Sequence, residues 1–267
     1  MELSGMGMPI KPRLCFTINP RRTLSEIRSF KELLANKIYH GIEIFYPYDE
    51  SPLQKEEYQR GIKELLEEKP EVVLHLPFGK ENDLCNLLTY QETLRRLIDA
   101  LDYGKSFGVK KYTIHLGYLQ GERSLLLKHL ITPLNILCKA SDGLIMFENM
   151  PRESELGYSP EEIKSLIDQV NKKNLGFIYD TGHGNISSYS LQDYFTILKK
   201  HLQHIHLNDN KGFIDEHKPI GYGTVDFKQL LSLNSDYTGL YCLEIIYQTV
   251  LDLQEYAKSF NNLLENK

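Results

Sequence analysis

Histidine and carboxylate side chains recur in this sequence where short apolar runs end. A single imidazole at such a place is usually a structural residue that finds a hydrogen-bond partner nearby. Here six consecutive runs end in or near such residues, and the loop after the fifth of these runs adds Asp215 and His217. The full set of candidates is His75, His115, Glu148, Asp180, His183, His206, Asp215, His217 and Glu244. Burying these groups together without a cation would leave several unsatisfied, at about 1–3 kcal/mol each. The pattern therefore predicts a bound metal.

The candidate ligands offer oxygen and nitrogen atoms but no sulfur. Such a set suits Zn, Mn, Co or Fe, whereas magnesium or calcium would use fewer histidines. Nine candidates exceed the roughly six ligands of an octahedral ion, so we expect one to three divalent ions, zinc or manganese, with surplus side chains orienting ligands or contacting substrate. We assign the other histidines to structure or surface: His40, His129, His201 and His204.

Eight short runs rich in β-branched and aromatic residues must position these side chains. We expect strands at Arg13–Asn19, Gly41–Tyr46, Glu71–Leu76, Lys111–Leu116, Gly143–Glu148, Leu175–Asp180, Gln203–Asn208 and Gly239–Ile245. Segments with helical periodicity separate or follow them, at Leu24–Ala35, Glu56–Glu68, Gln91–Phe107, Ser124–Lys139, Pro160–Asn171, Leu191–His201, Phe227–Leu233 and Leu251–Leu264. Apolar strand-like runs that alternate in this way with segments of 3.6-residue hydrophobic periodicity are typical of βα units.

Eight βα units predict a (β/α)₈ TIM barrel that spans residues 1–267 as a single domain. The alternative, an open doubly wound sheet, lacks the GxGxxG or P-loop that would accompany it. In a barrel, chemistry is carried out at the carboxyl ends of the strands. The candidate ligands lie at those ends.

Composition excludes several classes of protein. With 41% hydrophobic and 25% charged residues among 267, the chain is an ordinary globular protein rather than a disordered one. A net charge of −5 gives no mean attraction for a polyanion. The four cysteines form no CxxC pair, which indicates reduced core thiols in a cytoplasmic protein. Met1 to Arg13 has no apolar leader, and no run approaches the ~20 residues of a membrane span.

Several short motifs carry a family resemblance. They are Asp180-Thr-Gly-His183, His206-Leu-Asn-Asp-Asn-Lys211, Asp215-Glu-His217 and Gly221-Tyr-Gly-Thr-Val-Asp226-Phe, with His75-Leu-Pro-Phe and Glu148-Asn149 in support. The chain resembles the xylose isomerase-like TIM-barrel superfamily, which includes sugar isomerases and epimerases, inosose dehydratases and endonuclease IV. By this resemblance, all nine candidates match the ligands of the endonuclease's three-zinc site. The mononuclear epimerases match only Glu148, Asp180, His206 and Glu244.

The loops are more similar to the sugar phosphate isomerase/epimerase branch. The endonuclease pattern has cysteine where Gly182 stands, and alanine or serine where Asn210 stands. The resemblance then implies a divalent-metal-dependent isomerase or epimerase of a small carbohydrate. Glu148 and Glu244 would be the catalytic pair, one removing a proton beside the carbonyl and the other returning it. The substrate-binding residues would be Asn149, Asp209 and Lys211.

Two other functions remain open. A multi-zinc phosphodiesterase or abasic-site endonuclease would use all nine ligands, but its nucleic-acid partner calls for basic loops, and the sequence offers few such residues. They are Arg21, Arg22, Lys80 and Lys211. A metal- or sugar-binding barrel without activity is compatible with the fold, although every ligand position is filled.

Overall fold

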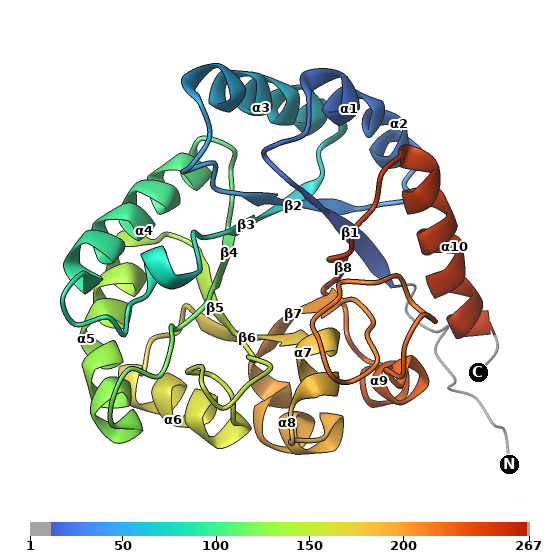
Figure 1. Ribbon diagram of the computed structural model, residues 1–267. Helices are drawn as coiled ribbons and strands as arrows, with labels where there is room; N and C mark the ends of the chain where they lie inside the picture. Colours follow the sequence, from blue (N-terminus) through green and yellow to red (C-terminus); the bar gives the residue numbers. More distant parts are fainter. Residues whose placement is uncertain (1–11, 266–267) are drawn as a thin grey trace, which may run out of the picture.

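Eight parallel strands close into one barrel in the computed structural model, which describes residues 12–265 (Figure 1). The Met1 to Arg13 segment, for which no leader is predicted, therefore lies almost wholly outside the described residues. The strands are β1 (Arg13–Ile18), β2 (Gly41–Phe45), β3 (Glu71–His75), β4 (Lys111–Ile114), β5 (Leu144–Glu148), β6 (Leu175–Asp180), β7 (Leu202–Leu207) and β8 (Leu240–Leu243). Each strand pairs with the next in sequence, and β8 pairs with β1, Cys242 opposite Cys15. The predicted TIM barrel is confirmed.

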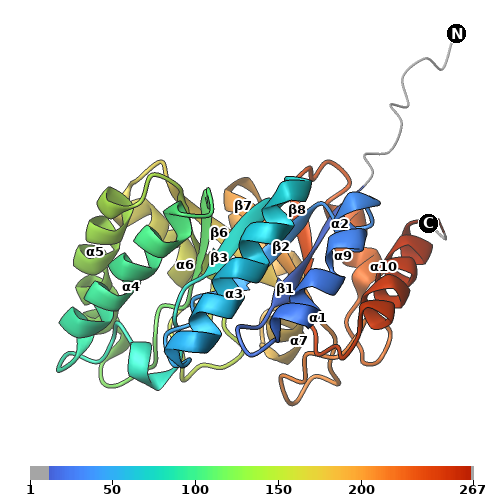
Figure 2. The same ribbon diagram turned by 90° about the horizontal axis from the view of Figure 1, so that it is seen from above.

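The helices form a ring outside the strands (Figures 1 and 2). They are α1 (Leu24–Ser29), α2 (Lys31–Ala35), α3 (Pro52–Leu65), α4 (Tyr90–Lys105), α5 (Arg123–Ala140), α6 (Pro160–Val170), α7 (Thr181–Ile186), α8 (Leu191–Leu198), α9 (Phe227–Leu233) and α10 (Val250–Glu265). Short 3₁₀ turns lie at Leu66–Glu68, Lys80–Asn82 and Lys199–His201. As its sequence predicts, α6 begins with Ser159 as N-cap, whose hydroxyl accepts from the Glu162 amide.

Two details differ from the expected helices. The predicted helix Leu24–Ala35 is divided at Phe30, which is the C-cap of α1 and whose buried ring packs edge-on against Phe16 and Tyr247. The short helix α7 was not predicted, because six residues rich in glycine carry no amphipathic pattern. Asp180 caps it, since its carboxylate accepts from the His183 amide at 2.7 Å.

Alternation along each strand divides buried side chains into two sets. Outward-facing residues pack with the helices in the large apolar core, whereas Cys15, Val73, Met146, Ile178, Leu240 and Cys242 form a separate small cluster. At the carboxyl ends of the strands the barrel is polar, with buried imidazoles and carboxylates. All four cysteines are buried and free of disulfides. Among the described residues, no helix combines the length and apolarity that crossing a membrane requires.

Candidate metal centre

His206 lies at the middle of a buried group of acids. Its Nδ1 atom is 2.9 Å from Glu244 Oε2, 3.2 Å from Glu148 Oε1 and 3.9 Å from Asp180 Oδ2. These four side chains come from β5, β6, β7 and the end of β8, and their ligand atoms lie within 4.8 Å of one another. Only Glu244 is measurably exposed, at 12% of its side chain. The group thus offers three carboxylates and one imidazole around a common point.

A second group shares Glu148 with the first. His115 Nε2 lies 3.0 Å from Glu148 Oε2, and His75 Nε2 lies 3.8 Å from the same oxygen. The opposite nitrogen of His75 is 2.9 Å from the Leu76 carbonyl, which fixes the ring with Nε2 toward the carboxylate. One oxygen of Glu148 therefore faces each group, and both groups would share this carboxylate if each held an ion.

A third group is formed by His183, Asp215 and His217. Asp215 Oδ2 lies 3.2 Å from His183 Nε2 and 2.9 Å from His217 Nε2. A backbone carbonyl holds the Nδ1 atom of each ring. The Asn149 carbonyl oxygen lies 2.9 Å from His183 Nδ1, and the Glu244 carbonyl oxygen lies 2.8 Å from His217 Nδ1. Both Nε2 atoms consequently face the same carboxylate. The structure brings all nine predicted ligands together in three adjoining groups.

The carboxylates and imidazoles of this centre shift one another's pKa. Burial raises the pKa of Asp180 to about 7, with a contribution from the negative charge of Glu148. Burial also disfavours ionised Glu148, but the positive charge and hydrogen bonds of the neighbouring histidines outweigh it and lower the pKa. Burial opposes the protonation of His217, yet Asp215 raises the pKa to about 10. Protons on imidazoles thus balance the carboxylates, and a divalent cation can replace them.

The predicted substrate-binding residues have other hydrogen-bond partners. The side chain of Asn149 accepts from the Asp180 amide at 2.7 Å and donates to its carbonyl at 3.0 Å. Asp209 is buried, and its carboxylate accepts from four backbone amides: Asn210, Gly221, Gly223 and Val225. Lys211 is exposed, with its ammonium 5.0 Å from the Tyr222 ring centroid. Substrate binding by these three residues stays a prediction, and the first two clearly shape the scaffold.

Glu43, on β2, is a residue of the centre that the sequence analysis missed. It is fully buried, and its Oε2 lies 3.0 Å from His206 Nε2 and 2.9 Å from His204 Nε2, while Thr113 donates to Oε1 at 2.7 Å. A carboxylate that accepts a hydrogen bond from Nε2 of His206 orients Nδ1 toward the acids, where a bound cation would replace its proton. The available signal was a charged residue inside the apolar run Gly41–Phe45. His204, expected at the start of its strand, lies inside the barrel.

A cavity of about 740 Å³ opens beside the centre. Its lining includes His75, His217 and Glu244, together with Phe78, whose ring lies 4.8 Å from that of His75. The two arginines that line the cavity are already paired. Arg21 contacts Glu50 at 3.2 Å, and the mostly buried Arg22 binds Glu26 and the backbone carbonyls of Tyr247 and Gln248. Neither arginine is therefore available to pair with the phosphates of a bound polyanion.

Comparison with known proteins assigns the chain to a family. Residues 33–265 match the model of a family described as xylose isomerase-like TIM barrel. The chain therefore belongs to the xylose isomerase-like TIM-barrel family. Its members are enzymes of more than one kind, since the proteins similar to this chain include sugar epimerases and endonuclease 4-like proteins.

The proteins similar to this chain carry the names of both kinds of enzyme, endonuclease and epimerase. A probable endonuclease 4 of Mycoplasmoides gallisepticum is 32% identical over 182 residues, 60% of this chain and 58% of that protein. An uncharacterised protein of Methanocaldococcus jannaschii is 27% identical over 187 residues, 64% of each chain. The match thus spans about three fifths of these relatives. A solved D-tagatose 3-epimerase-like protein shares the fold, with a TM-score of 0.71, 24% identity and coverage of 94% of this chain and 97% of the other.

Proposed function

We propose that this protein is a divalent-metal-dependent isomerase or epimerase of a small carbohydrate. The observation that carries the proposal is that Glu148 and Glu244, from different strands, both reach His206 Nδ1, at 3.2 and 2.9 Å. Two carboxylates held at one point of a buried centre are the parts needed to remove a proton beside a carbonyl and to return it. The adjoining cavity of about 740 Å³ has room for a sugar.

The residues fit a metal ion of the zinc or manganese type. Glu148, Asp180, His206 and Glu244 would hold it, because they supply four oxygen and nitrogen donors within 4.8 Å of one another. When bound, the ion supplies positive charge beside the carbonyl oxygen, where negative charge develops during proton transfer. One of the two glutamates, Glu148 and Glu244, removes the proton and the other returns it, and Phe78 lines the adjoining cavity.

Charge at the cavity rim supports a small substrate rather than a nucleic acid. The rim arginines are paired with Glu50 and Glu26, and Asp49 also lines the cavity. A nucleic-acid backbone requires unpaired lysine or arginine side chains along its path. A substrate of low charge meets no such requirement.

Solvent-isotope exchange tests the proposal without knowledge of the product. Manganese- or zinc-loaded protein in D₂O is incubated with a panel of ketoses, aldoses and their phosphates, and deuterium at carbon beside the carbonyl is measured by NMR. We expect exchange with at least one sugar, and a loss of about 10²-fold or more in Glu148→Gln and in Glu244→Gln. Glu161→Gln, on the exposed face of α6, is the matched control. Unchanged exchange in both glutamine variants would exclude this function.

One observation favours a second candidate, a multi-zinc phosphodiesterase of the endonuclease type. The His183, Asp215 and His217 group adjoins the other two groups, and similar proteins carry the name probable endonuclease 4. Three bound zinc ions would supply a nucleophilic water and balance the charge of a phosphodiester. Elemental analysis and X-ray absorption of untagged protein separate the candidates: about three zinc ions with nitrogen and oxygen ligands, and cleavage of an abasic duplex, favour the phosphodiesterase. One ion and sugar-dependent exchange favour the isomerase.

A further inference from the structure

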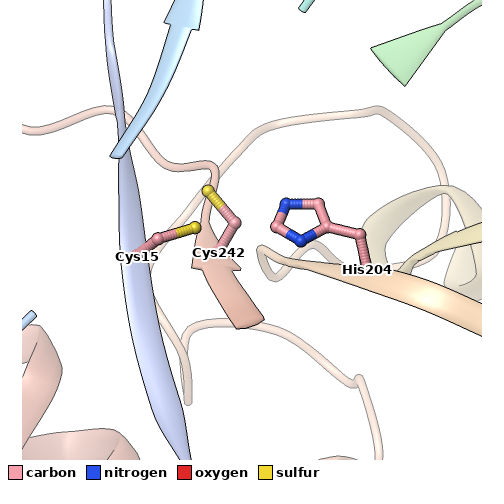
Figure 3. Close-up of side chains that lie close together, drawn as sticks. All are labelled: Cys15, His204 and Cys242. Carbon is pink, nitrogen blue, oxygen red and sulfur yellow. The ribbon is translucent and has the colours of Figure 1, made fainter. Parts of the chain in front are cut away.

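A second kind of metal-ligating cluster lies inside the barrel, below the centre already described. It consists of Cys15 on β1, Cys242 on β8 and His204 on β7, and Figure 3 shows the three side chains turned toward one another. The two sulfur atoms and a ring nitrogen of His204 lie within 4.8 Å of each other. All three residues are fully buried.

His204 has a free nitrogen at this place. Its Nε2 atom lies 2.9 Å from the Glu43 carboxylate, but its Nδ1 atom is buried and has no hydrogen-bond partner among the described residues. An unsatisfied buried polar atom costs free energy, so it calls for a partner. Because Nε2 is held by a carboxylate, Nδ1 is the nitrogen that remains for a metal, and acids beside metal-binding histidines commonly orient the ring in this way.

The surroundings of the three side chains are closed and apolar. Val73, Met146, Ile178 and Leu240 complete the small apolar cluster around the two cysteines, so water is excluded. Thiolate and imidazole ligands are preferred by thiophilic cations with a filled d shell, such as Zn²⁺ or Cu⁺. Hard cations such as magnesium prefer oxygen and are disfavoured.

We propose that Cys15, His204 and Cys242 bind one thiophilic ion, Zn²⁺ or Cu⁺, inside the barrel. The ion joins the first strand to the last, and so it stabilises the seam where β1 and β8 close the barrel. Because the cluster is fully buried, the ion enters while the chain folds. This site is separate from the nitrogen- and oxygen-ligated centre at the mouth and does not depend on the reaction catalysed there.

X-ray absorption detects this site specifically, because the mouth contains no sulfur ligand. The full-length untagged protein is produced in zinc-supplemented medium, and a second sample is refolded anaerobically with Cu⁺. We expect sulfur scatterers at about 2.3 Å from zinc, or sulfur ligands at the copper edge. Cys85→Ala/Cys138→Ala, which removes the other two buried cysteines, is expected to retain the sulfur signal. Cys15→Ala/Cys242→Ala is expected to lose it, together with one ion per chain.

Several outcomes would overturn the proposal. The proposal is wrong if the zinc and copper absorption edges of the wild-type protein show no sulfur ligand. It is also wrong if the Cys85/Cys138 control loses the sulfur signal. Mass spectrometry under non-reducing conditions that finds Cys15 joined to Cys242 also overturns it, since a disulfide leaves no thiolate for a metal. The wild-type and control measurements decide the question even where the Cys15/Cys242 variant fails to fold.

Discussion

Glu43 connects the two polar layers of the barrel, because one of its oxygens lies at 3.0 Å from His206 and 2.9 Å from His204. Both contacts use Nε2 atoms, so the Nδ1 atoms of the two rings point away from Glu43. His206 Nδ1 faces the acids at the mouth, and His204 lies beside the thiols. The role of this one carboxylate is therefore to orient two imidazoles.

Replacement of Glu43 by glutamine is expected to weaken metal binding at the mouth. An amide oxygen accepts the His206 proton less strongly, so we predict a zinc affinity lower by about 10- to 100-fold. Competition with a fluorescent zinc chelator measures this affinity. Glu71→Gln removes a carboxylate from the other end of the barrel, where it pairs with Arg13 and Lys111, and is the control. Equal zinc affinity of Glu43→Gln and wild type would contradict an orienting role.

At the scale of elements, the β6–α7 junction brings the three ligand groups into contact. Asp180 ends the strand and caps α7 through its Oδ1, while its Oδ2 accepts from the side-chain Nδ2 of Asn208 at 2.7 Å. The tight turn places His183 one helical turn beyond Asp180. Gly182 occupies the closest part of this junction, and a Cβ there would overlap Asn208 Oδ1. The glycine therefore permits the helix to approach β7.

Gly182→Ala is expected to destabilise the protein by about 1–3 kcal/mol, because an added methyl group in a packed junction forces neighbours apart. The same displacement moves His183 from Asp215, and metal content should fall with it. Urea unfolding measures the first effect, and elemental analysis the second. Ser165→Ala, on the exposed face of α6, is the control. A variant that keeps both stability and metal content would show that the junction is looser than the structure indicates.

For the whole molecule, the buried centre links stability to pH. The pKa of Asp180 rises from 3.8 to about 7 on folding because of burial, so the folded protein holds this proton more tightly than the unfolded chain. The contribution of Asp180 to stability then decreases as pH rises from 4 to 7, since the folded state binds this proton more tightly. Glu43, Glu148 and Glu244 act in the opposite direction below about pH 5.5, because their pKa values are lowered on folding. For His217, burial opposes protonation but Asp215 raises the pKa from 6.5 to about 10, and its contribution is lost as pH rises through that range.

We therefore predict that metal-free protein loses stability between about pH 6 and pH 10, above the range in which the glutamates of the unfolded chain titrate. The slope for one proton is at most about 1.4 kcal/mol per pH unit. Thermal unfolding of chelator-treated protein at a series of pH values measures it, and Asp180→Asn should flatten the lower part of the curve. Saturating zinc should also reduce the slope, because the ion replaces the protons. Rising stability from pH 6 to 9 in the metal-free protein would refute the assignment.

The sequence by itself determined the barrel and the edge at which its chemistry lies. Eight apolar runs alternate with helical segments, and strand ends in a parallel barrel converge on one face. Any ligand-type residue at such an end must lie near the others, which is why His75, Glu148, His206 and Glu244 were predictable from position alone. The break of the first helix at Phe30 and the short helix α7 depended instead on packing and capping contacts.

Only the tertiary structure decided which groups lie beneath the mouth. Glu43, His204, Cys15 and Cys242 come from four strands, two near each end of the sequence, and none stands at a strand end. Whether a buried strand residue faces the barrel interior or the helices depends on strand register and on closure of β8 against β1. Asn149 shows the same limit, because only the fold revealed that its amide is bound to Asp180. Local sequence pattern carries no information on these long-range pairings.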